Sequence, residues 1–154
     1  MEIANDLNYF FSTVYTIEDL ETIPNVQEVI ELHVEDFIFT EEDIFNQLKK
    51  LEECKAAGPD GIHPRVLKEL VSELKEPLKI IYDNSMSTGS VPLDWKEANV
   101  TPIFKKGDKN DSCNYRPVSV TPIVCRVLER LIKSHVVKFL EKNSLIRQTQ
   151  HGFI

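Results

Sequence analysis

Apolar side chains recur at the three- and four-residue spacing of an amphipathic helix along much of this chain. Stripes of this kind cover residues 3–14, 41–56, 66–74, 77–86 and 121–142, of which the last is the longest. Between residues 17 and 39 the apolar and acidic positions follow no clear period, and Pro24 interrupts them. The pattern therefore predicts a chain built mainly from helices.

Residues that begin or end helices mark the limits of these stripes. Thr40 precedes the three acids at 41–43, a hydroxyl cap followed by a negatively charged first turn, so we expect a helix from there to about residue 56. The Gly-Pro-Asp-Gly sequence at 58–61 predicts a tight turn that joins this helix to the next. Pro77 is expected to open a further helix, and Gly89 to close it.

The periodicity changes after residue 90. Residues 91–95 are typical of a loop, whereas residues 98–104 and 116–120 are two short runs that favour β-strands. The charged segment between the runs predicts that they form a hairpin with a basic, polar tip. The fold class expected from these elements is α+β and mostly helical, with N-terminal helices followed by a short β-hairpin and a long helix.

Composition supports one ordinary globular domain, because 42% of the 154 residues are hydrophobic and 28% are charged. No run of about 18 apolar residues and no secretory signal occurs, so we expect an intracellular protein with no membrane partner. The net charge of −7 is unevenly distributed. Residues 1–62 carry 15 acids against three lysines, and residues 63–154 carry 15 cations against 10 acids. Any surface that binds a polyanion is therefore expected in the second half, although the charge alone favours an ordinary solvated surface with uneven charge.

Cations gather at the predicted hairpin, where Lys105, Lys106, Lys109 and Arg116 surround the tip. Such side chains suit phosphate oxygens, since lysine acts as a point charge and arginine can contact two oxygens together. A loop kept soluble by its charge would show the same pattern, and the charge alone favours that reading.

Other residue types give no catalytic or metal-binding pattern. The three cysteines form no C-x-x-C pair, so we expect reduced thiols. The four histidines are not at ligand spacing from a cysteine or glutamate, and no metal site is expected in this chain.

Several short blocks follow one another in a distinctive order. They are Trp95-Lys96, Val100-Thr101-Pro102-Ile103-Phe104-Lys105-Lys106-Gly107-Asp108, Asn114-Tyr115-Arg116-Pro117-Val118-Ser119, Leu128-Glu129-Arg130 and Gln150-His151-Gly152-Phe153. Their order and spacing resemble the opening blocks of non-LTR retrotransposon reverse transcriptases, and most of all those of the jockey and chicken-repeat type of long interspersed elements. The block at residues 57–62, followed by Pro64, resembles the segment that precedes the fingers in the same family.

The resemblance implies roles for three groups of residues. Lys105 or Lys106, together with Arg116, would face the triphosphate of the incoming nucleotide. Gln150, Gly152 and Phe153 would lie where fingers meet palm, close to template and primer. Arg126, Arg130 and Lys133 on the long helix would touch template phosphates or form a solvated cationic face.

The resemblance also implies a division of the chain and an incomplete enzyme. Residues 1–57 would form an acidic helical extension, 58–95 a helical pre-fingers region, and 96–154 a partial fingers region. The palm aspartates that hold Mg in the complete enzyme would follow residue 153, so we expect no catalytic residue and no cofactor in this chain. The partners of the complete enzyme would be an RNA or DNA template-primer and a deoxynucleotide triphosphate.

Two alternatives remain open at the level of sequence. In one, the chain is a non-enzymatic helical module whose acidic residues 1–62 bind a basic protein. In the other, it is a non-functional transposon remnant, in which the helix at 121–142 exposes its apolar stripe because the palm is missing.

Overall fold

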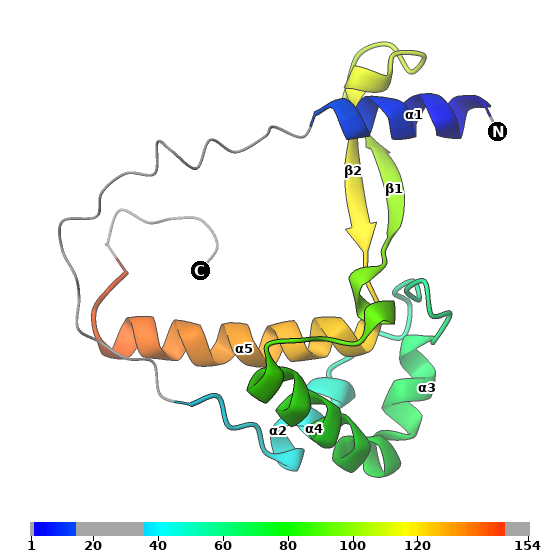
Figure 1. Ribbon diagram of the computed structural model, residues 1–154. Helices are drawn as coiled ribbons and strands as arrows, with labels where there is room; N and C mark the ends of the chain where they lie inside the picture. Colours follow the sequence, from blue (N-terminus) through cyan, green and yellow to red (C-terminus); the bar gives the residue numbers. More distant parts are fainter. Residues whose placement is uncertain (1, 15–35, 147–154) are drawn as a thin grey trace. The chain divides into compact units, whose positions relative to one another are not determined.

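The computed structural model describes residues 2–14 and 36–146, and it divides into two compact units (Figure 1). The first unit combines residues 1–32 with 100–119, and the second combines residues 33–99 with 120–154. Each unit is made from two separate stretches of the chain. The hairpin therefore belongs with the N-terminal helix, and the remaining helices form the second unit.

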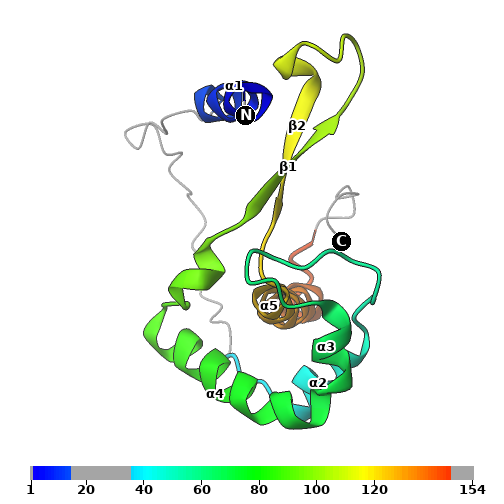
Figure 2. The same ribbon diagram turned by 90° about the vertical axis from the view of Figure 1, so that its right-hand side faces the viewer.

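The second unit is helical and contains the core. Its elements are α2 (Glu41–Lys49), α3 (Pro64–Glu69), α4 (Val71–Thr88), the 3-10 helix η2 (Leu93–Lys96) and α5 (Ile123–Lys142). Figure 2 looks along α5 and shows α2, α3 and α4 arranged around it. One cluster of buried side chains joins these helices: Phe39, Ile44, Leu48, Leu51, Leu67, Val71, Leu78, Tyr82, Ile123, Val124, Val127, Leu128 and Leu131.

Tyr82 lies at the centre of this core. Its ring is fully buried and meets Trp95 edge-on at 5.8 Å between centroids, so Trp95 packs against the core. The Tyr82 hydroxyl donates a 2.8 Å hydrogen bond to the backbone oxygen of Val124 on α5. Burial raises the pKa of this hydroxyl. The bond satisfies a polar group that would otherwise destabilise the core.

The first half of α5 packs its apolar stripe into this same core. Val127 is fully buried, and Val124 and Leu131 are less than a tenth exposed. The expectation that this helix would leave its apolar stripe exposed without the palm is therefore wrong for the first half of the helix, whereas Val136, Phe139 and Leu140 in the second half are only half-buried. Helices α2 and α4 cover the apolar stripe in the first half of α5, because their own apolar stripes face that helix.

The predicted start of α2 is confirmed, but the predicted end is wrong. Thr40 accepts a hydrogen bond from the Asp43 backbone N–H at 3.1 Å, and the Asp43 carboxylate accepts one from the Thr40 backbone N–H at 2.9 Å. This capping box lowers the pKa of Asp43 through the hydrogen bonds from Thr40. The helix ends at Lys49 rather than near residue 56, because the chain turns there and buries Leu51 in the core.

Pro77 does not begin a helix, contrary to the sequence-based expectation. It lies inside α4, and the break occurs earlier, at Leu70. Leu70 donates its N–H to the oxygen of Val66 and accepts the N–H of Leu74, both at 3.0 Å, so hydrogen bonding continues across the break. Burial of Val71 before Pro77 and of Leu78 after it holds α4 continuous despite the missing donor.

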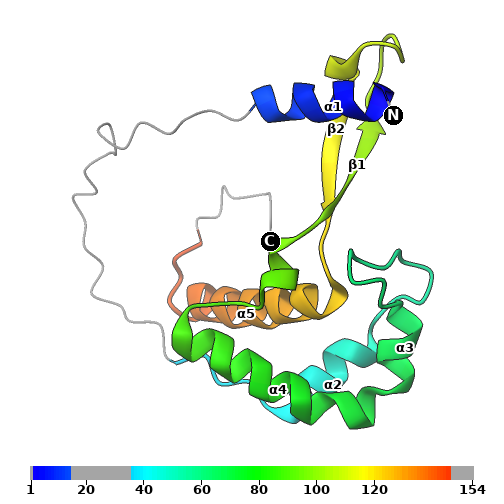
Figure 3. The ribbon, with the colours of Figure 1, turned by 45° about the vertical axis from the view of Figure 1, so that its right-hand side comes forward.

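The first unit consists of α1 (Glu2–Thr13) and a two-stranded sheet of β1 (Asn99–Phe104) and β2 (Tyr115–Val120), joined by a tip that includes the 3-10 helix η3 (Ser112–Asn114). Figure 3 shows the two long strands side by side. The strands confirm the predicted hairpin, and the whole structure confirms the α+β, mostly helical fold class. The division at residues 57 and 95, which followed from family resemblance, stays a prediction.

The hairpin register explains why each strand tolerates a proline. The N–H of Lys105 donates to the oxygen of Asn114 at 2.8 Å, and the ring centroids of Phe104 and Tyr115 lie 5.4 Å apart with their planes tilted by 59°. Counting from this Lys105–Asn114 pair away from the tip, along both strands, places Pro102 opposite Pro117. In an antiparallel ladder every second pair exchanges backbone hydrogen bonds, and the pair of prolines is one of those that do not. Neither proline therefore removes a bond from the ladder.

Candidate functional site

The tip of the hairpin is held by hydrogen bonds among its own polar residues. The Asn114 side-chain amide donates to the backbone oxygen of Asp108, and the Tyr115 hydroxyl donates to that of Lys109, each at 2.9 Å. Gly107 has a φ of +99°, and a Cβ added there would lie 2.8 Å from the Asn114 side chain. Glycine is thus required at this position both by the positive φ angle and by the lack of room for a Cβ atom beside Asn114.

The two carboxylates of the tip are also engaged locally. Asp108 accepts from the backbone N–H of Asn110 at 2.9 Å. Asp111 accepts from the backbone N–H of Cys113 at 3.0 Å and from its thiol at 2.9 Å. The thiol and backbone hydrogen bonds from Cys113 lower the pKa of Asp111, and the hydrogen bond to this carboxylate raises that of the Cys113 thiol. These acids shape the loop and form no ion pair with its lysines.

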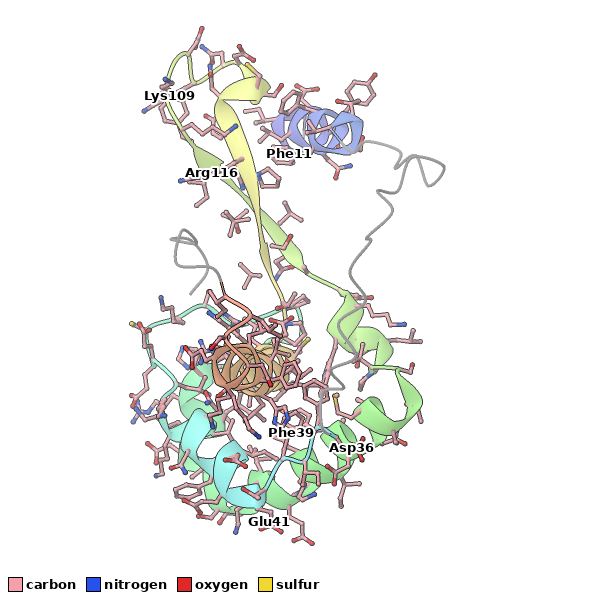
Figure 4. All side chains as sticks on the ribbon, turned by 90° about the vertical axis from the view of Figure 1, so that its left-hand side faces the viewer. Phe11, Asp36, Phe39, Glu41, Lys109 and Arg116 are labelled. Carbon is pink, nitrogen blue, oxygen red and sulfur yellow. The ribbon has the colours of Figure 1, made fainter. Side chains whose placement is uncertain are left out.

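The cations predicted to bind phosphate are exposed. Lys105 follows β1, Lys106 begins the turn, and Arg116 lies on β2, where Figure 4 labels it. Within the part of the chain that the structure describes, none of the three forms an ion pair. Lys109 differs, since its ammonium group lies 5.8 Å from the centre of the Phe104 ring. Three exposed cations without carboxylate partners thus surround one hairpin tip.

Helix α1 covers one face of the hairpin. Phe10, Phe11 and Val14 line a pocket of about 190 Å³ together with Tyr115, Pro117 and Lys105. Because side chains alternate along a strand, Arg116 lies on the face opposite Tyr115 and Pro117, away from this cover. The sequence predicted α1 as an amphipathic helix but gave no signal for what it packs against.

The other sequence-predicted site residues divide into two groups. Gln150, Gly152 and Phe153 lie outside the described residues. Arg126 and Arg130 line a pocket in the second unit, whereas Lys133 is exposed on the same helix.

No group of three or more His, Cys, Asp or Glu side chains that could hold a metal ion occurs in residues 2–14 and 36–146. The acids of the described chain thus do not fit the two-magnesium arrangement of a polymerase, and no metal-dependent step is assigned to them. Across the same residues, no helix is long and apolar enough to span a bilayer.

Comparison with known proteins gives a consistent set of relatives. The RNA-directed DNA polymerase from mobile element jockey of Drosophila melanogaster is 30% identical over 115 residues, which is 74% of this chain and 13% of that protein. The probable RNA-directed DNA polymerase from transposon X-element of the same organism is 29% identical over 100 residues, 64% of this chain and 11% of the relative. The chain is a relative of retrotransposon RNA-directed DNA polymerases.

A more distant match supports the same relationship. The putative 115 kDa protein in type-1 retrotransposable element R1DM of Drosophila melanogaster is 28% identical over 107 residues, 68% of this chain and 10% of that protein. No protein-family model matches the chain. The resemblance to non-LTR retrotransposon polymerases of the jockey type is confirmed by these relatives, of whose length the chain spans only 10–13%.

Proposed function

We propose that this chain is a segment of a retrotransposon reverse transcriptase, in which the hairpin tip binds phosphate groups and which does not catalyse polymerisation by itself. The observation that carries the proposal is the set of three exposed cations at the tip, Lys105, Lys106 and Arg116, none of which forms an ion pair in the described residues. The relatives that share this stretch are named as RNA-directed DNA polymerases.

The tip is suited to this role because its own hydrogen bonds fix its shape. Gly107 and Asn114 hold the turn, so less ordering is needed when a phosphate binds. Lys105 and Lys106 supply point charges, and the Arg116 guanidinium can donate two parallel hydrogen bonds. In the complete enzyme, these charges would offset the negative charge that develops on the phosphates of an incoming deoxynucleotide triphosphate.

The partners of the complete enzyme would be an RNA or DNA template-primer and the deoxynucleotide triphosphate. Gln150, Gly152 and Phe153 would contact template and primer near the palm. The carboxylates that bind Mg, and the chemistry that the ion supplies, would belong to another part of the enzyme. These partners are found inside cells, so the proposal keeps the intracellular location expected from the sequence.

The test is a titration of the chain with a fluorescently labelled deoxynucleotide triphosphate and with a labelled 20-nucleotide RNA over a range of salt concentrations. Replacing Lys105, Lys106 and Arg116 together by glutamine should weaken the binding of both ligands. For RNA, the slope of log affinity against log salt should flatten by about 2, since each phosphate contact to a single strand contributes about 0.7.

The matched control replaces Arg65, Lys96 and Lys138 by glutamine. These are also one arginine and two lysines, all exposed, and they lie outside the hairpin. The control should keep the wild-type slope and nucleotide affinity. Equal losses in the two triple variants would mean that binding follows net charge alone, and the proposal for the tip would then be wrong.

A further inference from the structure

Both strands of the hairpin leave one edge open. Among the described residues the sheet consists of β1 and β2, so each strand has a partner on one side and none on the other. Every residue of β1 is exposed, and β2 is at most partly buried at its two ends. An open edge presents backbone N–H and C=O groups that can pair with a strand of another chain. The hairpin thus offers two edges to which a third strand could be added.

The side chains of the hairpin favour such pairing. Val100, Ile103 and Val118 are each exposed by 40% or more, and β-branched residues have a high strand propensity. Strand β1 contains no charged residue, and β2 contains one, Arg116. Exposed apolar strands with little charge are the ones that associate through their edges, so another feature must prevent this association.

The register of the hairpin shows which backbone groups point outward. The bond from the Lys105 N–H to the Asn114 oxygen makes these two residues a hydrogen-bonded pair. Hydrogen-bonded and non-hydrogen-bonded pairs alternate along the ladder, and the backbone groups of the second kind point away from the partner strand. Those outward positions are Val100, Pro102 and Phe104 on β1, and Tyr115, Pro117 and Ser119 on β2.

A proline therefore stands in the middle of each open edge. Proline has no N–H, and its ring occupies the place of the missing hydrogen. On β1 the outward N–H groups of Val100 and Phe104 are separated by this gap. On β2 the Tyr115 N–H is already engaged, since it donates to the backbone oxygen of Ser112 in η3. Of the outward positions of β2, Ser119 thus keeps the available donor.

We propose that Pro102 and Pro117 keep the hairpin two-stranded by preventing a strand of a second copy of this chain from pairing with either edge. The two prolines do not weaken the hairpin itself, because the ladder between β1 and β2 uses neither position. Ligands consequently reach the hairpin over its faces or its tip. The inference concerns the strand backbone and does not depend on phosphate binding by the tip.

Pairing of β1 with β1 of a second copy shows why Pro102 matters most. Two identical edges pair around a two-fold axis, and an antiparallel arrangement centred on Pro102 places this residue opposite itself. That central pair is one in which both residues would exchange N–H···O bonds, so the two prolines remove both bonds and bring their rings together.

The experiment measures self-association of the full chain by sedimentation velocity over a range of concentrations. The variant P102V restores the central donor and keeps an apolar side chain, so its association constant should exceed that of the wild type by about ten-fold or more, as two hydrogen bonds are regained. The variant P117V should have a smaller effect, because the neighbouring outward donor of Tyr115 stays engaged.

The matched control is T101V. It places the same residue at the adjacent position of the same strand, but the N–H of residue 101 faces β2, so the open edge stays as it is. T101V should sediment like the wild type. Equal association of T101V and P102V would mean that strand propensity and apolar area decide the outcome, and the proposal would be wrong. It would also be wrong if P102V associated no more than the wild type.

A second measurement includes an arm that needs no variant. A hexapeptide with the sequence of β1, but with valine in place of proline, is added to the chain, and exchange of the Val100 and Phe104 amides is followed. The wild type should show no added protection, whereas P102V should protect both amides. Protection of these amides in the wild type would show that the proline-bearing edge accepts a strand and would overturn the proposal.

Discussion

Tyr82 shows how one polar atom is accommodated in the core of the helical unit. Its hydroxyl donates to the Val124 oxygen at 2.8 Å, and this bond links α4 to α5. Replacing Tyr82 by phenylalanine should lower the free energy of unfolding by about 1 kcal/mol, the usual net contribution of such a bond. Urea denaturation followed by circular dichroism measures the change.

Tyr9 provides the control for that substitution. It lies on α1 with 73% of its surface exposed, so the change to phenylalanine there should alter stability by less than about 0.5 kcal/mol. If Y82F and Y9F have the same effect, the buried hydrogen bond makes no net contribution and the description of the core is wrong.

Individual residues also show what sequence alone can and cannot predict about the site. Lys105, Lys106 and Arg116 were predicted as phosphate-binding residues from the order of the sequence blocks, since their charge alone fits a solvated loop. The structure places all three exposed on the hairpin, and their role in binding stays a prediction. The pocket around Arg126 was not predictable as a pocket, since it combines Lys50 with Arg126 from segments that only the fold brings together. The Arg126 Nε–H is buried without a hydrogen-bond partner among the described residues, and this depends on local packing that leaves no trace in residue spacing.

At the scale of elements, periodicity located the described α-helices and both strands, and tertiary packing decided where they end; the 3-10 helix at Leu93–Lys96 lies where the sequence predicted a loop. Helix α5 agrees with its stripe within two residues, and both strands agree within one. The errors concern the end of α2 and the start of α4, where burial of Leu51 and Val71 outweighs local sequence signals. Proline is a strong local signal, yet Pro77 lies within a helix because its neighbours are held by the core.

This position of Pro77 gives a prediction about α4. The proline is exposed and removes one hydrogen bond from the helix interior, so replacing it by alanine loses little packing and restores a donor. Alanine is favoured over proline inside a helix by roughly 3 kcal/mol, but it also gives the unfolded chain more conformational freedom, which offsets part of that gain. The free energy of unfolding of P77A should therefore be higher than that of the wild type by about 1–2 kcal/mol. The neighbouring exposed substitution E76A should change stability by less than about 0.5 kcal/mol. A decrease in the urea midpoint of P77A would contradict this account.

At the scale of the whole molecule, all residues of the core cluster belong to one of the two units. The hairpin unit contains none of the buried hydrophobic residues among those described, and it exposes Val100, Ile103 and Val118 by 40% or more. A two-stranded sheet with so little buried surface has low stability of its own. The helices and the hairpin should therefore open at different free energies.

Native-state hydrogen exchange tests this separation. The variant I44V removes one methyl group from a fully buried side chain and should lower the free energy of unfolding of the helical unit by about 1 kcal/mol. The slowest amides of α4 and α5 should then lose protection about five-fold. Hairpin amides from Val100 to Ser119 should exchange faster than those of the helices and should not respond to I44V, because their opening does not require the core to open. The converse variant V100A should affect hairpin amides alone. If I44V lowered protection equally in both units, the two units would unfold as one and the predicted separation would be wrong. Phosphate binding at the hairpin would then depend on the stability of the helical core.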